Sequence, residues 1–360
     1  MSDNLATPAL TDILSSARVV SLPLRTRFRG VVDREVMLFE GPNGWAEWSP
    51  FLEYPDEEAA IWLAAAIEFA YGELPTSVRQ SIPVNATLPA VPVDQIEKVL
   101  ARFGSFSTVK IKVAEPGQDL NEDLRRVWAV RAAYPNARIR LDANGAYSVE
   151  QAMAVAGAMI ENGVPLDYLE QPVATIAEMA ELRLKLAKAG IGADSEAGIK
   201  IAADESVRKV SDPMAVVQAR AADILVLKAA PLGGVSRAMA IAAEAGLPVV
   251  ISSALESSVG LSMGAHLASA LPWHGTATAS GATSPGGLAF DCGLATASLL
   301  AGDVTRDPLI PVDGFIDVRR IEVDQMKLDV FEAEDHRIDW WIDRLDRAFK
   351  FFSGEVPPGQ

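Results

Sequence analysis

The stretch ARIRLDANGAYSVEQAMAVAGAMIENGVPLDYLEQP, residues 137–172, decides the fold of this chain. It begins with a strand-like run at 137–142, passes through a turn, and continues into an alanine-rich helical stretch at 149–160. A second strand-like run, 166–170, follows within a few residues of the helix. Two short strands joined by a helix of this length form a βαβ unit, in which the strands lie parallel in one sheet.

The same unit repeats on both sides of this stretch. Further strands are expected at 82–87, 108–113, 199–204, 223–228 and 247–252, and a less clear eighth near 274–279. Helical stretches with an apolar period near 3.6 separate them, such as 119–133 and 234–245. Seven or eight strands in this alternation favour a closed (β/α) barrel, a fold of about 250 residues, over an open sheet.

The two ends of the chain follow a different pattern. Residues 1–80 contain three strand-like runs, with the turn Gly41-Pro42-Asn43-Gly44 before the third, and then a helix from about 55 to 72. From about residue 308 the chain is charged and rich in Trp and Phe. We therefore expect residues 1–80 to form the N-terminal part of an α+β capping domain and residues 81–307 the catalytic barrel. Residues 308–360 are expected to pack back on the cap.

The composition narrows the class of protein. The formal net charge of −16 argues against a nucleic-acid partner and against a basic membrane-binding surface. Residues 257–290 carry no Asp, Glu, Lys or Arg, but they are too rich in Gly, Ser and Thr for a membrane-spanning helix. The one cysteine, Cys292, excludes an intrachain disulfide, and the first residues do not resemble a signal peptide. We expect a soluble protein of the reducing cytoplasm.

Carboxylates stand at the carboxyl ends of successive predicted strands. Asp142, Glu170 and Asp204 end three consecutive strands. In a parallel barrel these ends converge on one face, where the active sites of this fold lie. Carboxylates gathered at one point are unfavourable without a counterion, and three hard oxygen ligands suit Mg²⁺ or Mn²⁺. The alternative is that each acid caps the helix that follows it.

Lysines stand at the same end of the predicted barrel. Lys110 and Lys112 share one face of their strand, and Lys228 ends a strand on the opposite side of the barrel. Crowding and burial lower the pKa of a lysine, so that it can act as a base near neutral pH. The alternative is that these are separate lysines that reach solvent. Arg140, which shares a face with Asp142, is expected either beside the ligand or in a structural salt bridge.

These motifs together resemble a known superfamily. KIK (110–112), LDANGAY (141–147), LEQP (169–172) and DES (204–206), with a lysine on the next strand, are similar to the lysine-based, muconate-lactonizing-like branch of the enolase superfamily. The resemblance extends over nearly the whole chain. It implies a modified (β/α)7β TIM-like barrel with an α+β capping domain. It also implies that Asp142, Glu170 and Asp204 bind Mg²⁺, and that Lys112 is the acid/base with Lys228 on the other face of the substrate.

Two further segments, GWAEWSPFLEY (44–54) and VVISSALESSVGLSMG (249–264), resemble the o-succinylbenzoate synthase family. This resemblance implies loss of water from 2-succinyl-6-hydroxy-2,4-cyclohexadiene-1-carboxylate, which gives o-succinylbenzoate in menaquinone biosynthesis. Lys112 would remove the proton alpha to the carboxylate. Mg²⁺, or Mn²⁺ in its place, and Lys228 would stabilise the enediolate that forms.

The residues expected to bind the substrate or to support the catalytic groups are Lys110, Arg140, Asn144, Ser252, Ser253 and Arg29. Ser252 and Ser253 are expected to hold the remote succinyl carboxylate, with a helix N-cap as the alternative role for serines of this run. Residues 24–32, which contain four basic or aromatic side chains at 25 and 27–29, are predicted to form a lid that brings an arginine toward an anionic substrate. A plain hairpin turn with solvated arginines is the alternative.

Other functions are compatible with the same residues. An N-acylamino acid racemase or dipeptide epimerase would use Lys112 and Lys228 as bases on opposite faces of one carbon. A cycloisomerase is a third option. A non-enzymatic scaffold barrel is disfavoured, because a cluster of acids and lysines is unfavourable to keep for folding alone. In each enzymatic case the expected ligand is a small anionic molecule.

Overall fold

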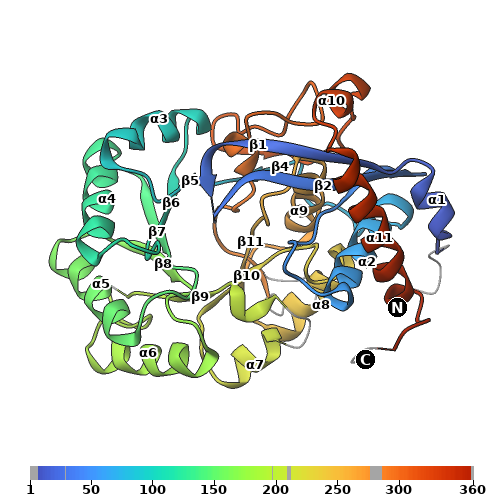
Figure 1. Cartoon of the computed structure of the whole chain (residues 1–360). Helices are drawn as coiled ribbons and strands as arrows, with labels where there is room; N and C mark the ends of the chain where they lie inside the picture. Colours follow the sequence, from blue (N-terminus) through green and yellow to red (C-terminus); the bar gives the residue numbers. More distant parts are fainter. Residues whose placement is uncertain (1–6, 29, 197, 209–211, 276–285, 358–360) are drawn as a thin grey trace.

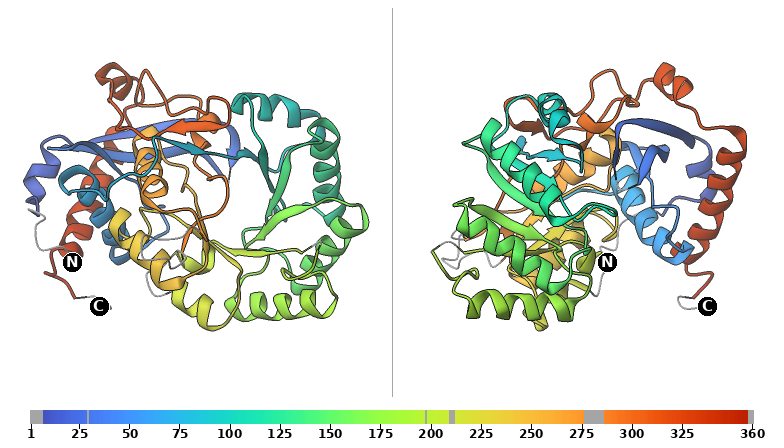
Figure 2. Two further views of the ribbon diagram at one scale, coloured as in Figure 1. Left: turned by 180° about the vertical axis from the view of Figure 1, so that it is seen from behind. Right: turned by 60° about the vertical axis from the view of Figure 1, so that its left-hand side comes forward.

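The structure is a computed structural model that describes residues 7–28, 30–196, 198–208, 212–275 and 286–357 (Figure 1). A parallel barrel occupies one side of the molecule. The first and last parts of the chain lie together on the other side, in the two further views as well (Figure 2). This arrangement confirms the predicted fold class, a (β/α) barrel with an α+β cap.

The barrel sheet has the strand order β12-β11-β10-β9-β8-β7-β6-β5, and its neighbouring strands run parallel. Its strands are β5 (Ala86–Leu88), β6 (Thr108–Lys112), β7 (Arg138–Asp142), β8 (Leu166–Glu170), β9 (Ile201–Ala203), β10 (Ile224–Leu227), β11 (Pro248–Ile251) and β12 (Gly287–Leu288). The two edges meet where Val84 and Cys292 form a parallel bridge. Asn85 N–H donates to the Cys292 carbonyl at 3.0 Å, and Cys292 N–H donates to the Pro83 carbonyl at 2.7 Å.

Two strand predictions differ from the structure in position. The predicted strand 82–87 is split, because β4 (Ser81–Pro83) pairs antiparallel with β13 (Phe315–Asp317) and only β5 joins the barrel. Pro83 has no N–H group to donate to a ladder, and the chain changes partners there. The last barrel strand is β12, which lies later in the chain than predicted. Residues 276–279 of that prediction lie outside the described residues.

The helices of the barrel are α3 (Ile96–Leu100), α4 (Leu120–Ala133), α5 (Val149–Glu161), α6 (Ile176–Lys188), α7 (Asp212–Gln218), α8 (Val235–Ala245) and α9 (Ser258–Ala270). Three of them, α4, α5 and α6, begin at capping boxes that the sequence supplies. Asp119, Ser148 and Thr175 accept a backbone hydrogen bond at the start of α4, α5 and α6, and a Glu or Gln three residues later returns one. These capping boxes define where α4, α5 and α6 begin.

The cap combines an antiparallel sheet with helices from both ends of the chain. β1 (Arg18–Phe28), β2 (Val31–Gly41) and β3 (Gly44–Trp48) form the sheet, and α2 (Asp56–Tyr71) follows it. α11 (Asp335–Phe352) packs against α2 and β1, with the ring of Trp341 edge-on to Trp48 at 5.4 Å between centroids. We propose that the cap and the barrel divide near residues 80 and 308.

The remaining helical elements are short. They are α1 (Leu10–Leu14), α10 (Gln325–Val330) and the 3-10 turns η1 (Val93–Gln95), η2 (Ala101–Phe103), η3 (Glu205–Val207) and η4 (Thr296–Leu299). A separate apolar cluster of barrel residues contains Tyr168, Ala202, Ile224, Val226 and Val250, with Phe290 packed against it. Among the described residues, none of the helices combines the length and the apolar character that crossing a bilayer requires.

Candidate active site

Buried charged side chains form a row across the ends of five barrel strands, β6 to β10. The strand register pairs Lys112 of β6 with Asp142 of β7, and Asp142 with Glu170 of β8, so these side chains leave the sheet on one face at one level. Asp204 and Lys228 directly follow β9 and β10. Each of the five residues is at most 6% exposed. The barrel thus brings the predicted catalytic and metal-binding residues to one end of the sheet.

The lysines and carboxylates of this row, together with Lys110 of β6, are paired directly. Lys110 Nζ lies 2.8 Å from Glu170 Oε1 and 3.3 Å from Asp142 Oδ2. Lys112 Nζ lies 2.5 Å from the same Asp142 oxygen, and Lys228 forms an ion pair with Asp204. A close opposite charge offsets the unfavourable transfer of each charge out of water.

This pairing changes the proton affinity of Lys110. Burial disfavours its ammonium form, but the charges of Glu170 and Asp142 outweigh burial and raise the pKa of Lys110 above its usual value. The expectation of a lowered pKa is therefore wrong for Lys110, because two carboxylates lie within 3.3 Å of its nitrogen. Lys110 stays a cation at neutral pH and is suited to supply positive charge rather than to accept a proton.

The surroundings of the Glu170 carboxylate indicate whether the carboxylates of the row suit a divalent cation. Its Oε2 atom is buried and has no hydrogen-bond partner, and burial together with the charge of Asp142 raises the pKa of Glu170 to about 7. A hard cation is a suitable partner for such an oxygen. With the lysines paired as they are, no three His, Cys, Asp or Glu side chains of the described residues are arranged to hold a metal ion. The oxygen donors fit Mg²⁺, whose binding would require the lysine–carboxylate contacts to rearrange.

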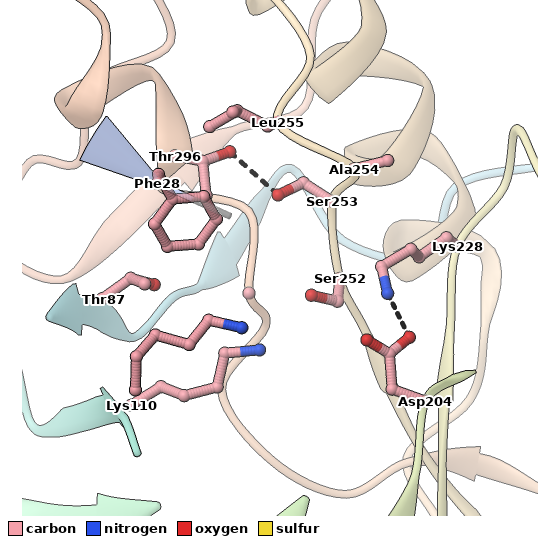
Figure 3. Close-up of a pocket in the computed structure, with 12 residues that line it drawn as sticks. Phe28, Thr87, Lys110, Asp204, Lys228, Ser252, Ser253, Ala254, Leu255 and Thr296 are labelled. Carbon is pink, nitrogen blue, oxygen red and sulfur yellow. Dashed lines mark hydrogen bonds and ion pairs between the residues drawn. The ribbon is translucent and has the colours of Figure 1, made fainter. Parts of the chain in front are cut away.

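A narrow pocket lies between Lys110 on one side and the Lys228–Asp204 pair on the other, with Ser252 between them (Figure 3). It is lined by Phe28, Thr87, Lys110, Lys112, Asp204, Lys228, residues 252–255, Gly293 and Thr296. The pocket holds only about 20 Å³, and Lys112 Nζ lies 5.2 Å from the centre of the Phe28 ring. About one water molecule would fill this space. Substrate access therefore requires the walls of the pocket to move.

Asn144 and Gln171 hold the acids and bases in place. Asn144 Oδ1 accepts a hydrogen bond of 2.7 Å from Lys112 Nζ, and its amide donates to Glu205 at 3.2 Å. Gln171 Oε1 accepts from the backbone N–H groups of Asp204 and Ser206, both at 3.1 Å. Asn144 therefore lies against the predicted base. Gln171 is not among the residues predicted from the sequence, although it directly follows Glu170 in the LEQP motif.

Arg208 is a second residue that the sequence analysis missed. Its guanidinium lies 3.5 Å from Asp204 Oδ2, forms an ion pair with Glu205, and donates to Tyr54 Oη at 3.1 Å. Burial disfavours its charged form, but Asp204 and Glu205 raise the pKa of Arg208. Arg208 lies three and four residues after these acids on the turn that contains η3. This helical spacing is the signal that could have identified it.

Arg140 and Arg29 do not join the described pocket. Arg140 is fully buried and donates to Asp167 at 3.1 Å, to Asn85 Oδ1 at 3.0 Å and to the Asp291 carbonyl at 2.6 Å. It is not among the described residues that line the pocket, so the geometry favours a structural salt bridge for Arg140. Arg29, the arginine predicted in the lid, lies outside the described residues.

The serines that follow β11 have two different roles. Ser252 and Ser253 line the pocket, and Ser253 Oγ lies 2.8 Å from Thr296 Oγ1. Ser257 instead caps α9 and accepts a backbone N–H of that helix at 3.2 Å. The N–H and hydroxyl groups of Ser257 both donate to Glu47 of β3, at 3.0 and 2.5 Å. The helix N-cap alternative therefore holds for Ser257, where the barrel meets the cap.

Comparison with known proteins places this geometry in a family. A model described as "Enolase C-terminal domain-like" matches residues 92–321, and one described as "Enolase N-terminal domain-like" matches residues 19–70. Among solved structures, muconate lactonizing enzyme from Pseudomonas putida has a TM-score of 0.67 at 20% identity, covering 88% of this chain and 98% of that one. The enzyme from Pseudomonas fluorescens complexed with muconolactone has a TM-score of 0.69, also at 20% identity, with the same coverage. These structures support the fold.

Two curated relatives are much closer in sequence. The o-succinylbenzoate synthase of Mycobacterium ulcerans (strain Agy99) is 48% identical over 340 residues, which are 94% of this chain and 95% of that protein. The o-succinylbenzoate synthase of Mycobacterium leprae (strain TN) is 47% identical over 342 residues, which are 95% of this chain and 94% of that protein. Both parts of the fold and almost the full length of the chain are thus matched, and the chain belongs to the o-succinylbenzoate synthase family of the enolase superfamily.

Proposed function

We propose that this protein catalyses the loss of water from 2-succinyl-6-hydroxy-2,4-cyclohexadiene-1-carboxylate, giving o-succinylbenzoate for menaquinone biosynthesis. The observation that carries the proposal is that lysines reach one pocket from two sides, Lys112 from β6 and Lys228 from the end of β10. Asp142 and Asp204 pair with them. The names of the curated relatives point to the same reaction.

Lys112 is the proposed general base. It lines the pocket and donates a hydrogen bond to Asn144 Oδ1, and in the structure without a metal ion it also pairs with Asp142. In its neutral form, Lys112 removes the proton alpha to the substrate carboxylate, and the electron pair of the C–H bond moves into the carboxylate as an enediolate. The Lys112 ammonium then gives its proton to the departing hydroxyl group as the C–O bond breaks. Water leaves, the ring becomes aromatic, and Lys112 is neutral again.

Lys228 is proposed to stabilise the intermediate from the opposite side. Lys228 lines the pocket, and in the structure without a metal ion it forms an ion pair with Asp204. A fixed positive charge beside the developing enediolate lowers the free energy of the transition state, most effectively where water is excluded. Lys110 lines the pocket on the β6 side, where it adds positive charge.

Asp142, Glu170 and Asp204 are proposed to hold Mg²⁺, for which Mn²⁺ would substitute. When bound, the ion would supply Lewis-acid stabilisation of the negative charge on the substrate carboxylate. Glu170 contributes the buried oxygen that has no hydrogen-bond partner. Dependence on a divalent metal is general in the enolase superfamily, which supports the proposal.

The opposite wall of the pocket is proposed to bind the succinyl carboxylate. Ser252 and Ser253 offer hydroxyl donors there, and Gly293 lets the backbone approach them closely, since a Cβ at this position would lie 2.5 Å from Ser252 Oγ. Phe28 stands at the end of β1, over Lys112. We propose that the segment carrying Phe28 moves to admit the substrate and returns to exclude water during the reaction.

The charge of the substrate and the state of Cys292 complete the proposed function. We propose that the protein acts on a small anionic substrate in the cytoplasm, where its one cysteine stays reduced. Cys292 is buried at the closure of the barrel, and burial raises the pKa of its thiol to about 12. A thiol with so high a pKa is not a nucleophile at neutral pH.

Absorbance-monitored conversion of the cyclohexadiene substrate, with and without Mg²⁺, tests this function. We expect conversion to o-succinylbenzoate that EDTA abolishes and added Mg²⁺ restores. Conversion that is insensitive to EDTA would reject the role of the metal ion. Absence of conversion by protein that binds Mg²⁺ would reject the reaction and favour racemisation of N-acylamino acids by Lys112 and Lys228.

A further inference from the structure

A second cavity, which we call the basic cavity, lies beside η4 and has a volume of about 610 Å³. Its polar lining includes Arg25, Arg102, Arg306, Lys327, Ser298 and Asp303. The turn η4 borders both sites, because Thr296 lines the active-site pocket and Ser298 lines the basic cavity. The strand β1 does the same, with Phe28 at the pocket and Arg25 at the cavity.

Two arginines of the basic cavity form no ion pair within the described part of the chain. Arg25 donates from Nε to the Leu300 carbonyl at 2.8 Å, and Arg102 donates from Nη1 to Thr26 Oγ1 at 3.2 Å. Both side chains line the same cavity, and burial together with the charge of Arg25 lowers the pKa of Arg102. A guanidinium group carries five N–H donors, and a carboxylate accepts two of them side by side.

Ser298 provides an independent sign of a ligand. The residue is only 3% exposed, and its Oγ atom has no hydrogen-bond partner. Buried hydroxyl groups normally form hydrogen bonds, and each exception needs an explanation. This oxygen has almost no accessible surface, so the Ser298 side chain would rotate about its Cα–Cβ bond to donate its hydroxyl to a ligand oxygen in the basic cavity.

The other charged side chains of the lining do not neutralise Arg25 and Arg102. Asp303 accepts hydrogen bonds from Ser258 and from the Val304 N–H, so its oxygens are directed into the protein. Arg306 is paired with Asp324, outside the cavity lining. Leu300, Pro308 and Ile310 add apolar surface to the lining, which suits a ligand with a carbon frame.

We propose that the basic cavity binds a small organic carboxylate. Its carboxylate group is held by Arg25 and Arg102, one of its oxygens accepts from the rotated Ser298 hydroxyl, and its carbon frame rests on the apolar part of the lining. This site is separate from the active-site pocket, and its occupancy does not depend on the proposed reaction.

Calorimetric titration with phthalate, a small aromatic dicarboxylate, tests the proposal on the full chain. We expect Arg102→Gln to weaken phthalate binding roughly tenfold or more, because charge-assisted hydrogen bonds are lost. The matched control is Arg125→Gln, which removes the same charge from an exposed arginine of α4 that does not line the cavity. This control should bind phthalate as the unaltered protein does. Equal affinities of the two variants would overturn the proposal.

Three further titrations extend the test. Ser298→Ala removes a hydroxyl with no partner in the protein, so we expect unchanged thermal stability and phthalate binding weakened several-fold. If Ser298→Ala bound phthalate as tightly as the unaltered protein does, the proposed contact between Ser298 and the ligand would be rejected. The neutral diamide phthalamide should not bind, and binding as strong as that of phthalate would exclude an anion site. If inorganic phosphate bound more tightly than phthalate, the proposal that the ligand has a carbon frame would be rejected.

Discussion

At the scale of single residues, Lys112 carries the proposed proton transfer. Lys112→Ala should lower kcat roughly 10²–10⁴-fold, because the general base is lost, while the fold is retained. Lys110 would still pair with Asp142 and Glu170 and keep the carboxylates compensated. Conversion of the cyclohexadiene substrate gives the rate, and circular dichroism gives the fold. The control is Lys98→Ala at an exposed position of α3, and a rate for Lys112→Ala close to that of this control would contradict the role of Lys112.

Glu170 makes a second prediction at this scale, concerning the metal ion. Glu170→Gln keeps an oxygen that can accept from Lys110 but removes the negative charge and one carboxylate oxygen. We expect Mn²⁺ affinity, measured from the electron paramagnetic resonance signal of the free ion, to fall at least roughly 10–100-fold. Glu161→Gln, at an exposed position of α5, should bind Mn²⁺ normally. Equal Mn²⁺ binding by both variants would show that Glu170 is not a ligand.

At the scale of elements, Glu47 joins the cap to the barrel. This carboxylate of β3 accepts from Ser49 Oγ at 2.6 Å, from Ser257 N–H at 3.0 Å and from Gly260 N–H at 3.2 Å, at the start of α9. The residues immediately before α9, including Ala254 and Leu255, line the active-site pocket. The helix start and the pocket wall are therefore held by a residue from the other part of the fold.

The pKa of Glu47 predicts a pH dependence of stability. Burial, with a contribution from the charge of Glu256, raises this pKa from 4.5 to about 7. The folded state then binds a proton more tightly than the unfolded state. The stabilisation is complete below about pH 4.5 and is lost as the pH rises through 7. Urea unfolding should show Glu47→Gln gaining stability relative to the unaltered protein between pH 5 and 7.5, by at most roughly 3 kcal/mol.

An exposed glutamate of the cap supplies the control for this measurement. Glu53→Gln should follow the unaltered protein across the same pH range, because the residue is exposed. A difference between Glu47→Gln and the unaltered protein that stays constant with pH would mean that Glu47 does not titrate in this window. If Glu47→Gln instead lost stability relative to the unaltered protein as the pH rose, the hydrogen bonds that Glu47 accepts would stabilise its charged form more than burial disfavours it.

At the scale of the whole molecule, α11 joins the end of the chain to its beginning. Trp341 is fully buried, stands edge-on to Trp48, and donates from Nε1 to Glu35 Oε2 at 2.9 Å. Trp341→Ala should lower the free energy of unfolding by roughly 3–5 kcal/mol, since it leaves a large cavity between the two segments. The neighbouring Trp340→Ala, at a half-buried position, should lose less. Urea unfolding of both variants measures the difference, and equal losses would contradict this account of the interface.

The row of proposed catalytic and metal-binding residues could be predicted from the sequence because it depends on local rules. Side chains alternate along a strand, and the ends of parallel strands meet at one face, so Lys112, Asp142 and Glu170 could be grouped without coordinates. Gln171 and Glu47 were not identified, because their roles lie in contacts with backbone groups far along the chain. Glu47, for example, meets Ser257 across 210 residues. No sequence pattern encodes the presence of such a partner.

By itself, the sequence determined the alternation of strands and helices, the position of the charged residues at the strand ends, and the capping residues that begin the helices. Each of these follows from periodicity and from hydrogen bonds between near neighbours. Only the tertiary structure decided which charges pair, and hence that the pKa of Lys110 is raised, how narrow the pocket is, and that Arg25, Arg102 and Ser298 line one cavity. These properties depend on distances across the closed barrel and between barrel and cap. Such distances are set by the packing of segments remote in the chain.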